Sequence, residues 1–184
     1  MKEKETGQIS SRRVYNGRII SVDVDEVRFP NGTSGELEMV RHPGASAVVP
    51  FLDHPRDPDP RIILIRQYRY AANGFVHEIP AGRLDHGETP PECAARELRE
   101  ETGYSASELI PLTTFYTTPG FTDERIHLFA AVGLTEGESE LESDEILELA
   151  RVPMSRALQM IHAGELVDGK SMVGLFFASR FMRA

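Results

Sequence analysis

The feature that most constrains the fold is a short helix whose two ends are both marked in the sequence. Thr89, two prolines and Glu92 form the pattern of a capping box with proline in the first turn, and Gly103 supplies a stop signal. The residues between these signals, PPECAARELREET, predict a helix of about four turns. Any fold of this chain must therefore bury one side of this helix, although the helix carries several carboxylates.

Two glutamates of this helix fall beside its expected core side. At about 100° per residue, Glu101 projects between two core positions and Glu97 lies roughly 40° to one side of them. Like charges one turn apart at a core edge repel each other and lose hydration, which costs several kcal/mol unless something compensates. Divalent cations are the natural compensation, and carboxylates without His or Cys favour Mg²⁺ or Mn²⁺ over zinc. The expected core side is formed by Ala94, Ala95, Leu98 and Thr102.

Composition limits the classes of protein to which the chain can belong. A length of 184 residues with 40% hydrophobic content suits one domain with a substantial core. The single cysteine, Cys93, excludes an internal disulfide framework and is expected to be a small core residue. The net charge of −9 disfavours nonspecific binding to nucleic acid. No apolar leader or run near twenty residues is present, so we expect a cytoplasmic protein without a membrane partner.

The remaining sequence mixes strand and helix patterns. About ten residues at the start have a composition typical of disorder. Alternating residues on both sides of a PNG turn predict an antiparallel hairpin, and short β-branched runs predict buried strands around a proline-rich loop. This mixture favours an α+β sandwich over a regular βαβ repeat. The expected strands are 19–29, 36–40, 46–52, 61–68, 125–134 and 146–152, and the further helices are 153–164 and 172–184.

The charged helix is part of a longer pattern of fixed spacing. Gly82 is followed by five residues, Glu88, seven residues and then RELREETGY. This pattern resembles the signature of the Nudix hydrolases, which cleave a nucleoside diphosphate linked to another moiety. The resemblance implies the Nudix fold, an α/β/α sandwich around a mixed sheet. Tyr104 stands where the family pattern prefers an aliphatic residue.

The resemblance also assigns roles to residues of this pattern. It implies that Glu97 and Glu101 are metal ligands, that the backbone carbonyl of Ala81 joins them, and that Glu100 belongs to the catalytic group as a further ligand. Arg96 is expected to orient Glu100 through an i,i+4 pair. The implied cofactor is Mg²⁺, with Mn²⁺ as a substitute. Clustered divalent ions suit the chemistry, because phosphoryl transfer needs charge neutralisation and a deprotonated water.

A second pattern narrows the resemblance to one subfamily. Pro119 in YTTPGFTDE lies fifteen residues beyond Tyr104, which resembles the marker of the ADP-ribose pyrophosphatases, as do HEIPAGRLDHGETP and IRQYRYAA. On this similarity two arginines would contact the phosphates or flank the adenine, and two glutamates would accept hydrogen bonds from adenine or ribose hydroxyls. His42 is an alternative to the first of these arginines. The implied substrate contacts are Arg41, Arg69, Glu78 and Glu124.

The attacking water needs a base outside this pattern. The acidic stretch LTEGESELESDEILEL is the counterpart of the loop that supplies it in the subfamily, and Glu145 is our first choice, as base or further metal ligand. Glu142 is the second choice. A solvated acidic loop explains most of the seven acidic residues between Glu136 and Glu148. An exposed glutamate is sufficient, because metal-bound water has a lowered pKa.

Together these resemblances predict a Mg²⁺-dependent enzyme that cleaves ADP-ribose to AMP and ribose 5-phosphate. They imply a homodimer in which residues 1–42 are N-terminal strands that contribute to dimerisation and residues 43–184 are the hydrolase domain. The alternatives are the same chemistry on GDP-mannose, another ADP-sugar or NADH, and a noncatalytic module that binds ADP-ribose. The intact glutamates argue against the module, and the charge argues against an RNA-directed activity.

Overall fold

The computed structural model describes residues 6–137 and 147–182. The chain divides into two compact units, of which the first comprises residues 1–44 and 115–125 and the second comprises residues 45–114 and 126–184. The chain therefore leaves the first unit after Gly44 and returns to it once, with residues 115–125.

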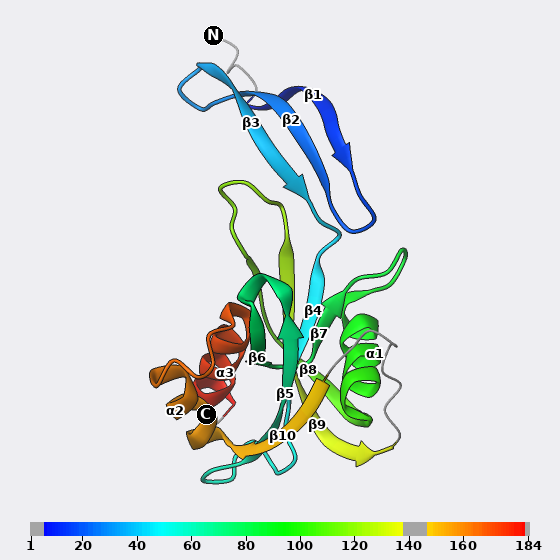
Figure 1. The fold of residues 1–184 in the computed structure, drawn as a ribbon, viewed down its shortest axis with the longest axis vertical. Coiled ribbons are helices and arrows are strands. Elements are labelled where there is room, and N and C mark those ends of the chain that lie inside the picture. The colour runs from blue at the N-terminus through cyan, green and yellow to red at the C-terminus, as the bar shows by residue number, and fades with distance from the viewer. Residues whose placement is uncertain (1–5, 138–146, 183–184) are drawn as a thin grey trace. The chain divides into compact units, whose positions relative to one another are not determined.

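The first unit contains an antiparallel sheet with the order β1-β2-β3 (Figure 1). The predicted hairpin is confirmed, since β2 pairs with β3 and Gly32 adopts the positive φ of 84° that the turn needs. The expectation of disorder at the start of the chain is wrong from Gly7 onward, because these residues form a strand that pairs with β2. The strands are β1 (Gly7–Asn16), β2 (Ser21–Arg28) and β3 (Ser34–Arg41).

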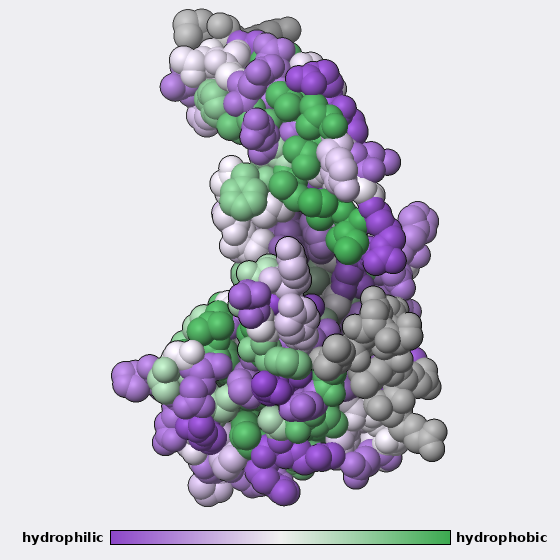
Figure 2. Space-filling view, in the orientation of Figure 1, coloured by the Kyte–Doolittle hydropathy of each residue, from purple (hydrophilic) through white to green (hydrophobic). Residues whose placement is uncertain are grey.

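Many apolar side chains of the first unit lie at its surface. Every residue of β1 is exposed, so this strand has no buried face that could have revealed it in the sequence. Figure 2 shows hydrophobic side chains at the surface of this sheet. Exposed apolar surface of this extent is typical of a face that contacts another protein. The exposed large hydrophobic residues of these strands and their connections are Ile9, Val14, Tyr15, Ile19, Ile20 and Leu37.

The second unit contains two sheets with helices on both sides. One sheet has the order β10-β5-β6, and the other has the order β7-β4-β9-β8, in which β4 runs parallel to β9 and antiparallel to β7. The strands are β4 (Ala45–Pro50), β5 (Arg61–Arg69), β6 (Gly74–Glu78), β7 (Ala81–Arg83), β8 (Tyr104–Tyr116), β9 (Arg125–Glu136) and β10 (Leu147–Pro153), and a 3₁₀ turn, η1 (Tyr70–Ala72), joins β5 to β6. The last two residues of β8 and the first residue of β9 belong to the first unit.

The helices cover these sheets from opposite sides. Within the second unit, α1 (Pro90–Thr102) lies on one side of the strands, and α2 (Met154–His162) and α3 (Gly169–Phe181) lie on the other (Figure 1). The predicted α/β/α sandwich around a mixed sheet is therefore confirmed. Among the helices that the structure describes, none is long and apolar enough to cross a membrane.

The core of the second unit fixes the position of α1. Leu98 packs in a cluster with Val48 of β4, Ile63 of β5 and Phe129 of β9, and each of these side chains is at most 5% exposed. Fully burying an aliphatic side chain of this size contributes about 1.5–3 kcal/mol. The cluster therefore holds the carboxylate-bearing side of α1 against the strands.

Candidate active site

The ends of α1 have the structure that the sequence predicted. The backbone N–H of Thr89 donates to Glu92 Oε2 at 2.9 Å, which closes the capping box. Gly103 ends the helix with φ 76°, and its N–H donates to the Arg99 carbonyl at 2.8 Å. The register of the helix is thus set at both ends, which fixes the direction of each carboxylate between them.

Glu97 and Glu101 lie inside the buried side of α1. Their residues are only 9% and 3% exposed. The sequence placed them at the edge of a core side that included Ala95, and this was wrong, because Ala95 is exposed and the buried side is rotated toward the glutamates. The buried residues of α1 are Cys93, Ala94, Glu97, Leu98, Glu101 and Thr102.

The short strand β7 contacts both buried carboxylates. A Cβ atom on Gly82 would lie 1.8 Å from Glu97 Oε1, so only glycine leaves room for this carboxylate against the strand. The neighbouring N–H of Ala81 donates to Glu101 Oε2 at 2.9 Å. The structure thus places Ala81 in contact with Glu101, and Glu97 beside the neighbouring Gly82. Their role as metal ligands stays a prediction. Ala81 contacts Glu101 through its N–H, whereas the sequence singled out its carbonyl.

Arg96 forms ion pairs with three glutamates of this segment. Its Nε and Nη2 donate to the two carboxylate oxygens of Glu88 at 2.8 and 2.9 Å. Its Nη1 donates to Glu97 Oε1 at 2.6 Å and to Glu100 Oε2 at 3.0 Å. The Arg96–Glu100 pair was predicted, whereas the contacts with Glu88 and Glu97 were not.

These ion pairs determine the charge states of the groups around Arg96. The hydrogen bonds from Arg96 lower the pKa of Glu88 to about 2, and the hydrogen bonds to Glu88 contribute most to raising the pKa of Arg96. Both groups are therefore fully charged near neutral pH. A single fixed cation orients Glu97 while leaving the segment rich in negative charge.

The donor set of this segment suits a hard divalent cation. Glu97 and Glu101 supply carboxylate oxygens, the ligands that Mg²⁺ and Mn²⁺ prefer. Burial raises the pKa of the nearby Cys93 to about 11, so this thiol is protonated and is a poor metal ligand. Within residues 6–137 and 147–182, no group of three or more His, Cys, Asp or Glu side chains is placed to hold a metal ion. Two buried carboxylates are the part of a metal site that these residues provide.

Of the three glutamates predicted to be catalytic, the structure describes Glu100. Glu100 lies on α1, 3.0 Å from Arg96 Nη1 and 3.8 Å from Arg99 Nη2. Its carboxylate is therefore shared between two arginines. Glu142 and Glu145 lie outside the residues that the structure describes, so their role as base stays a prediction.

Two of the predicted substrate contacts meet on the β5–β6 hairpin. Arg69 donates from Nε to Glu78 Oε1 and from Nη2 to Glu78 Oε2, both at 2.8 Å. Burial alone would raise the pKa of Glu78, but Arg69 and Lys170 outweigh it and lower the pKa. The Glu78 bonds are the largest cause that raises the pKa of Arg69, and Glu101 adds to this effect. The negative charge of Glu101 on α1 thus helps to stabilise the charged form of Arg69.

Lys170 is a contact of Glu78 that the sequence did not reveal. It lies in the first turn of α3, and its ammonium donates to Glu78 Oε2. Asp168, the N-cap of α3, accepts from the N–H of Ser171 at 2.9 Å. The DGKS stretch carries a cap signal, but nothing local indicates a partner on a distant strand.

The other two predicted substrate contacts lie in the first unit. Arg41 donates to carboxylates of Asp23, Asp25 and Asp123. Glu124 accepts from Thr117 Oγ1 at 2.9 Å and lies 3.4 Å from His42 Nδ1. Burial disfavours the charged form of Arg41, but these aspartates outweigh it and raise the pKa. Arg41 is thus held by three carboxylates of its own unit.

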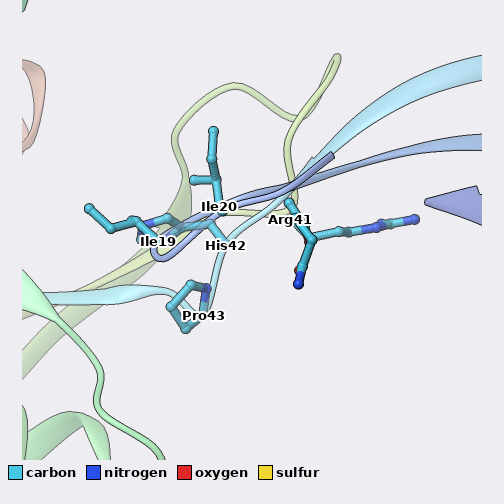
Figure 3. A pocket seen from close by; sticks show the side chains of 8 residues that line it. Ile19, Ile20, Arg41, His42 and Pro43 are labelled. Carbon is cyan, nitrogen blue, oxygen red and sulfur yellow. The ribbon is translucent and has the colours of Figure 1, made fainter. Parts of the chain in front are cut away.

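A surface hollow of about 280 Å³ lies beside this network in the first unit. Figure 3 shows Ile19, Ile20 and Pro43 around the hollow, with the Arg41 side chain extending away from the two isoleucines. The lining is thus largely apolar on one side. The lining residues are Asn16, Gly17, Ile19, Ile20, Ser21, Arg41, His42 and Pro43.

Comparisons with known proteins agree over nearly the whole chain. The family model "NUDIX domain" matches residues 40–172, and "Nucleoside diphosphate sugar hydrolase N-terminal domain" matches residues 8–36. The chain is 40% identical over 173 residues to "ADP-ribose pyrophosphatase" of Bacillus subtilis (strain 168), covering 93% of this chain and 91% of that protein. It is 38% identical over 173 residues to "Methanol dehydrogenase activator" of Bacillus methanolicus, with the same coverage of 93% and 91%.

A solved structure has the same fold. "Crystal structure of ADP compounds hydrolase" superposes with a TM-score of 0.82, covering 100% of both chains at 22% sequence identity. At this identity the likeness concerns the fold. It extends to the N-terminal strands as well as to the sandwich, because the coverage is complete.

Proposed function

The chain belongs to the NUDIX hydrolase family, and on that premise we propose that it hydrolyses the pyrophosphate of ADP-ribose to AMP and ribose 5-phosphate. The observation that carries this proposal is the pair of buried carboxylates on α1, set against β7 in a chain that matches an ADP-ribose pyrophosphatase over 93% of its length. A binding module would gain nothing from two like charges in a core. A hydrolase needs them to hold a cation.

The cofactor in this proposal is Mg²⁺, which Mn²⁺ can replace. Glu97 and Glu101 would hold it, together with the Ala81 carbonyl and Glu145. When bound, the ion neutralises phosphate charge and lowers the pKa of water. The chain itself contributes the fixed carboxylates: Gly82 gives Glu97 its place, and Arg96 restrains it.

Arg69 is the phosphate contact that the geometry supports best. Within the described residues its Nε and Nη2 are engaged by Glu78, so Nη1 is left to donate to a phosphate oxygen. The bidentate pair fixes the plane of the guanidinium, which reduces the entropy that substrate binding costs. Glu78 is proposed to accept from a ribose hydroxyl or from adenine.

The remaining substrate and base assignments are tested by substitution. Arg41 and Glu124 are proposed to contact the nucleotide, with His42 as the alternative to Arg41. Glu145 is proposed as the base, with Glu142 second and with Glu100 as a further ligand. Each assignment predicts a loss of catalytic efficiency when the side chain is replaced by one that cannot make the proposed contact.

The first unit supports a proposal of dimerisation. We infer that residues 1–42 pair two copies of the chain and that residues 43–184 act as the hydrolase domain. The exposed apolar side chains of β1 and of the β1–β2 connection support this inference. Gel filtration with light scattering tests it, and a monomer at micromolar concentration would contradict it. The single cysteine suits a reducing compartment, for which we propose the cytoplasm.

A second candidate is the same chemistry on another nucleoside diphosphate derivative. The match of residues 8–36 to a domain named for nucleoside diphosphate sugar hydrolases favours this breadth. GDP-mannose, another ADP-sugar or NADH would then replace ADP-ribose. The catalytic carboxylates would be unchanged, and only the contacts to the base and sugar would differ.

A product assay separates these possibilities. ADP-ribose, NADH, GDP-mannose, diadenosine polyphosphates and 8-oxo-dGTP are compared by catalytic efficiency, with and without Mg²⁺. Metal-dependent release of AMP from ADP-ribose at the highest efficiency supports the proposal. Preference for another compound of the panel would change the proposed substrate but not the proposed reaction. Binding without hydrolysis would instead support the noncatalytic module.

A further inference from the structure

Lys170 is a nearly buried cation fixed by carboxylates. Its side chain is only 14% exposed, and its ammonium pairs with Glu78 Oε2 and, at 3.1 Å, with Asp168 Oδ2. Asp168 is itself fixed, because it caps α3 and accepts from the Ser171 hydroxyl and N–H. The ammonium therefore has one defined position at the start of α3.

Glu78 connects this lysine to Arg69. The Glu78 side chain is only 3% exposed, and both its oxygens accept from Arg69 while Oε2 also accepts from Lys170. A buried carboxylate is stable as an anion only when its partners are well placed. Glu78 thus has two cationic partners on different elements, Arg69 on β5 and Lys170 on α3.

The same turn of α3 also holds the chain that leads to the buried glutamates. Ser171 Oγ accepts from the N–H of Ile79 at 2.8 Å, and Ser171 is fully buried. Two residues further on, the N–H of Ala81 donates to Glu101. The start of α3 therefore restrains the segment from Glu78 to Ala81, between the Arg69 pair and the carboxylates of α1.

We propose that Lys170 is a positioning residue, which holds the Glu78 carboxylate so that Glu78 presents Arg69 to the phosphates of the substrate. This inference rests on the proposed function, since it takes Arg69 as a phosphate contact. Without the ammonium, Glu78 keeps Arg69 as a partner but loses its anchor to α3. The pair then moves together, and Nη1 of Arg69 no longer has one direction.

The test compares Lys170→Met, which keeps the length of the side chain, with Lys170→Arg, which keeps the charge. The matched control is Arg156→Met, which removes a cation from an ion pair with Glu165 whose side chains are 47% and 44% exposed. We expect Lys170→Met to raise KM for ADP-ribose by about tenfold or more with kcat within about twofold, the size of one lost charge-assisted hydrogen bond. We expect Lys170→Arg to recover part of the loss and Arg156→Met to equal the wild type.

A double substitution shows whether Lys170 acts through Glu78. If it does, Lys170→Met adds little to the defect of Glu78→Gln, because the group that it positions has already changed. Multiplying defects, or a loss in Lys170→Met that only follows a lower melting temperature, would overturn the inference and leave a structural role.

Binding of the non-hydrolysable α,β-methylene analogue of ADP-ribose, measured by calorimetry, separates this inference from the proposed function. A wild type that neither binds the analogue nor cleaves ADP-ribose contradicts both. A wild type that binds and cleaves, beside a Lys170→Met variant with the same affinity and KM, contradicts the role of Lys170 alone.

Discussion

The substitution Gly82→Ala tests the placement of Glu97 by adding one methyl group. Gly82 lies in the extended strand β7, so an alanine backbone is permitted there. The added Cβ would lie 1.8 Å from Glu97 Oε1, 2.1 Å from Cδ and 2.5 Å from Oε2. The carboxylate must therefore move by more than about 1 Å, and a displacement of that size at a catalytic group can cost about 100-fold in rate.

The fold should tolerate this change better than the activity does. Glu97 can swing away because its carboxylate is the end of a flexible side chain, at the cost of its bond to Arg96 Nη1. That loss is about 1–2 kcal/mol, and the lower entropy of the unfolded alanine chain offsets up to about 1 kcal/mol of it. We therefore expect nearly unchanged thermal unfolding beside a large loss of kcat and a higher Mg²⁺ requirement.

The assay is AMP release from ADP-ribose across a Mg²⁺ titration, with melting followed by circular dichroism. Gly120→Ala is the matched control, because a Cβ at Gly120 meets nothing within 4 Å. A Gly82→Ala enzyme with wild-type kcat and Mg²⁺ dependence would refute the reasoning, since it would show that Glu97 need not occupy this position. A variant that fails to fold would show that Glu97 has no room to move.

Further predictions concern single groups of the second unit. Glu101→Gln should fold, because the amide oxygen can still accept from Ala81, but turnover should fall by orders of magnitude; near-normal turnover would remove Glu101 from the metal site. Glu145→Gln should lower kcat more than the affinity for ADP-ribose, and an unchanged rate would move the base to Glu142 or elsewhere. The ion pair with Arg96 lowers the pKa of Glu88 in the folded protein to about 2, from 4.5 in the unfolded chain, so the charged Glu88 stabilises the fold fully above pH 4.5 and loses this effect as the pH falls through 2. In urea titrations the loss of unfolding free energy caused by Glu88→Gln should therefore shrink over that pH range. A loss that stays constant with pH would contradict the ion pair. Cys93 should not react with iodoacetamide at pH 8 in the native protein, since its thiol pKa is about 11 and the residue is fully buried, and rapid labelling would contradict this environment.

The parts of the structure that the sequence predicted are those whose signals are local. The capping box at Thr89, the stop at Gly103 and the spacing of Glu97 and Glu101 all lie within one helix, so helical geometry was enough to place them. The hairpin of β2 and β3 followed from the PNG turn between alternating strands.

Two of the strands that the sequence missed, β1 and β8, lack such signals. In β1 every residue is exposed, so no alternation marks it, and its stability comes from pairing with β2 and from contacts such as the Arg13–Asp23 ion pair. In β8, intermediate and exposed positions follow no period of two, and Pro111 argues against a strand, yet the sheet places β8 beside β9. Tertiary pairing overrides weak local preference in both cases.

The polar cluster around Glu78 shows why part of the site was beyond prediction from sequence. Arg69 and Glu78 were each assigned to the substrate, but their mutual pairing follows from the geometry of the β5–β6 hairpin. Lys170 lies 92 residues beyond Glu78, and only the packing of α3 brings its ammonium to that carboxylate. A motif names the groups that touch the reacting atoms, whereas the groups that hold them in place can come from any element that the fold delivers. For this reason replacing Lys170 tests a part of the site that the structure shows and that the sequence motif does not contain.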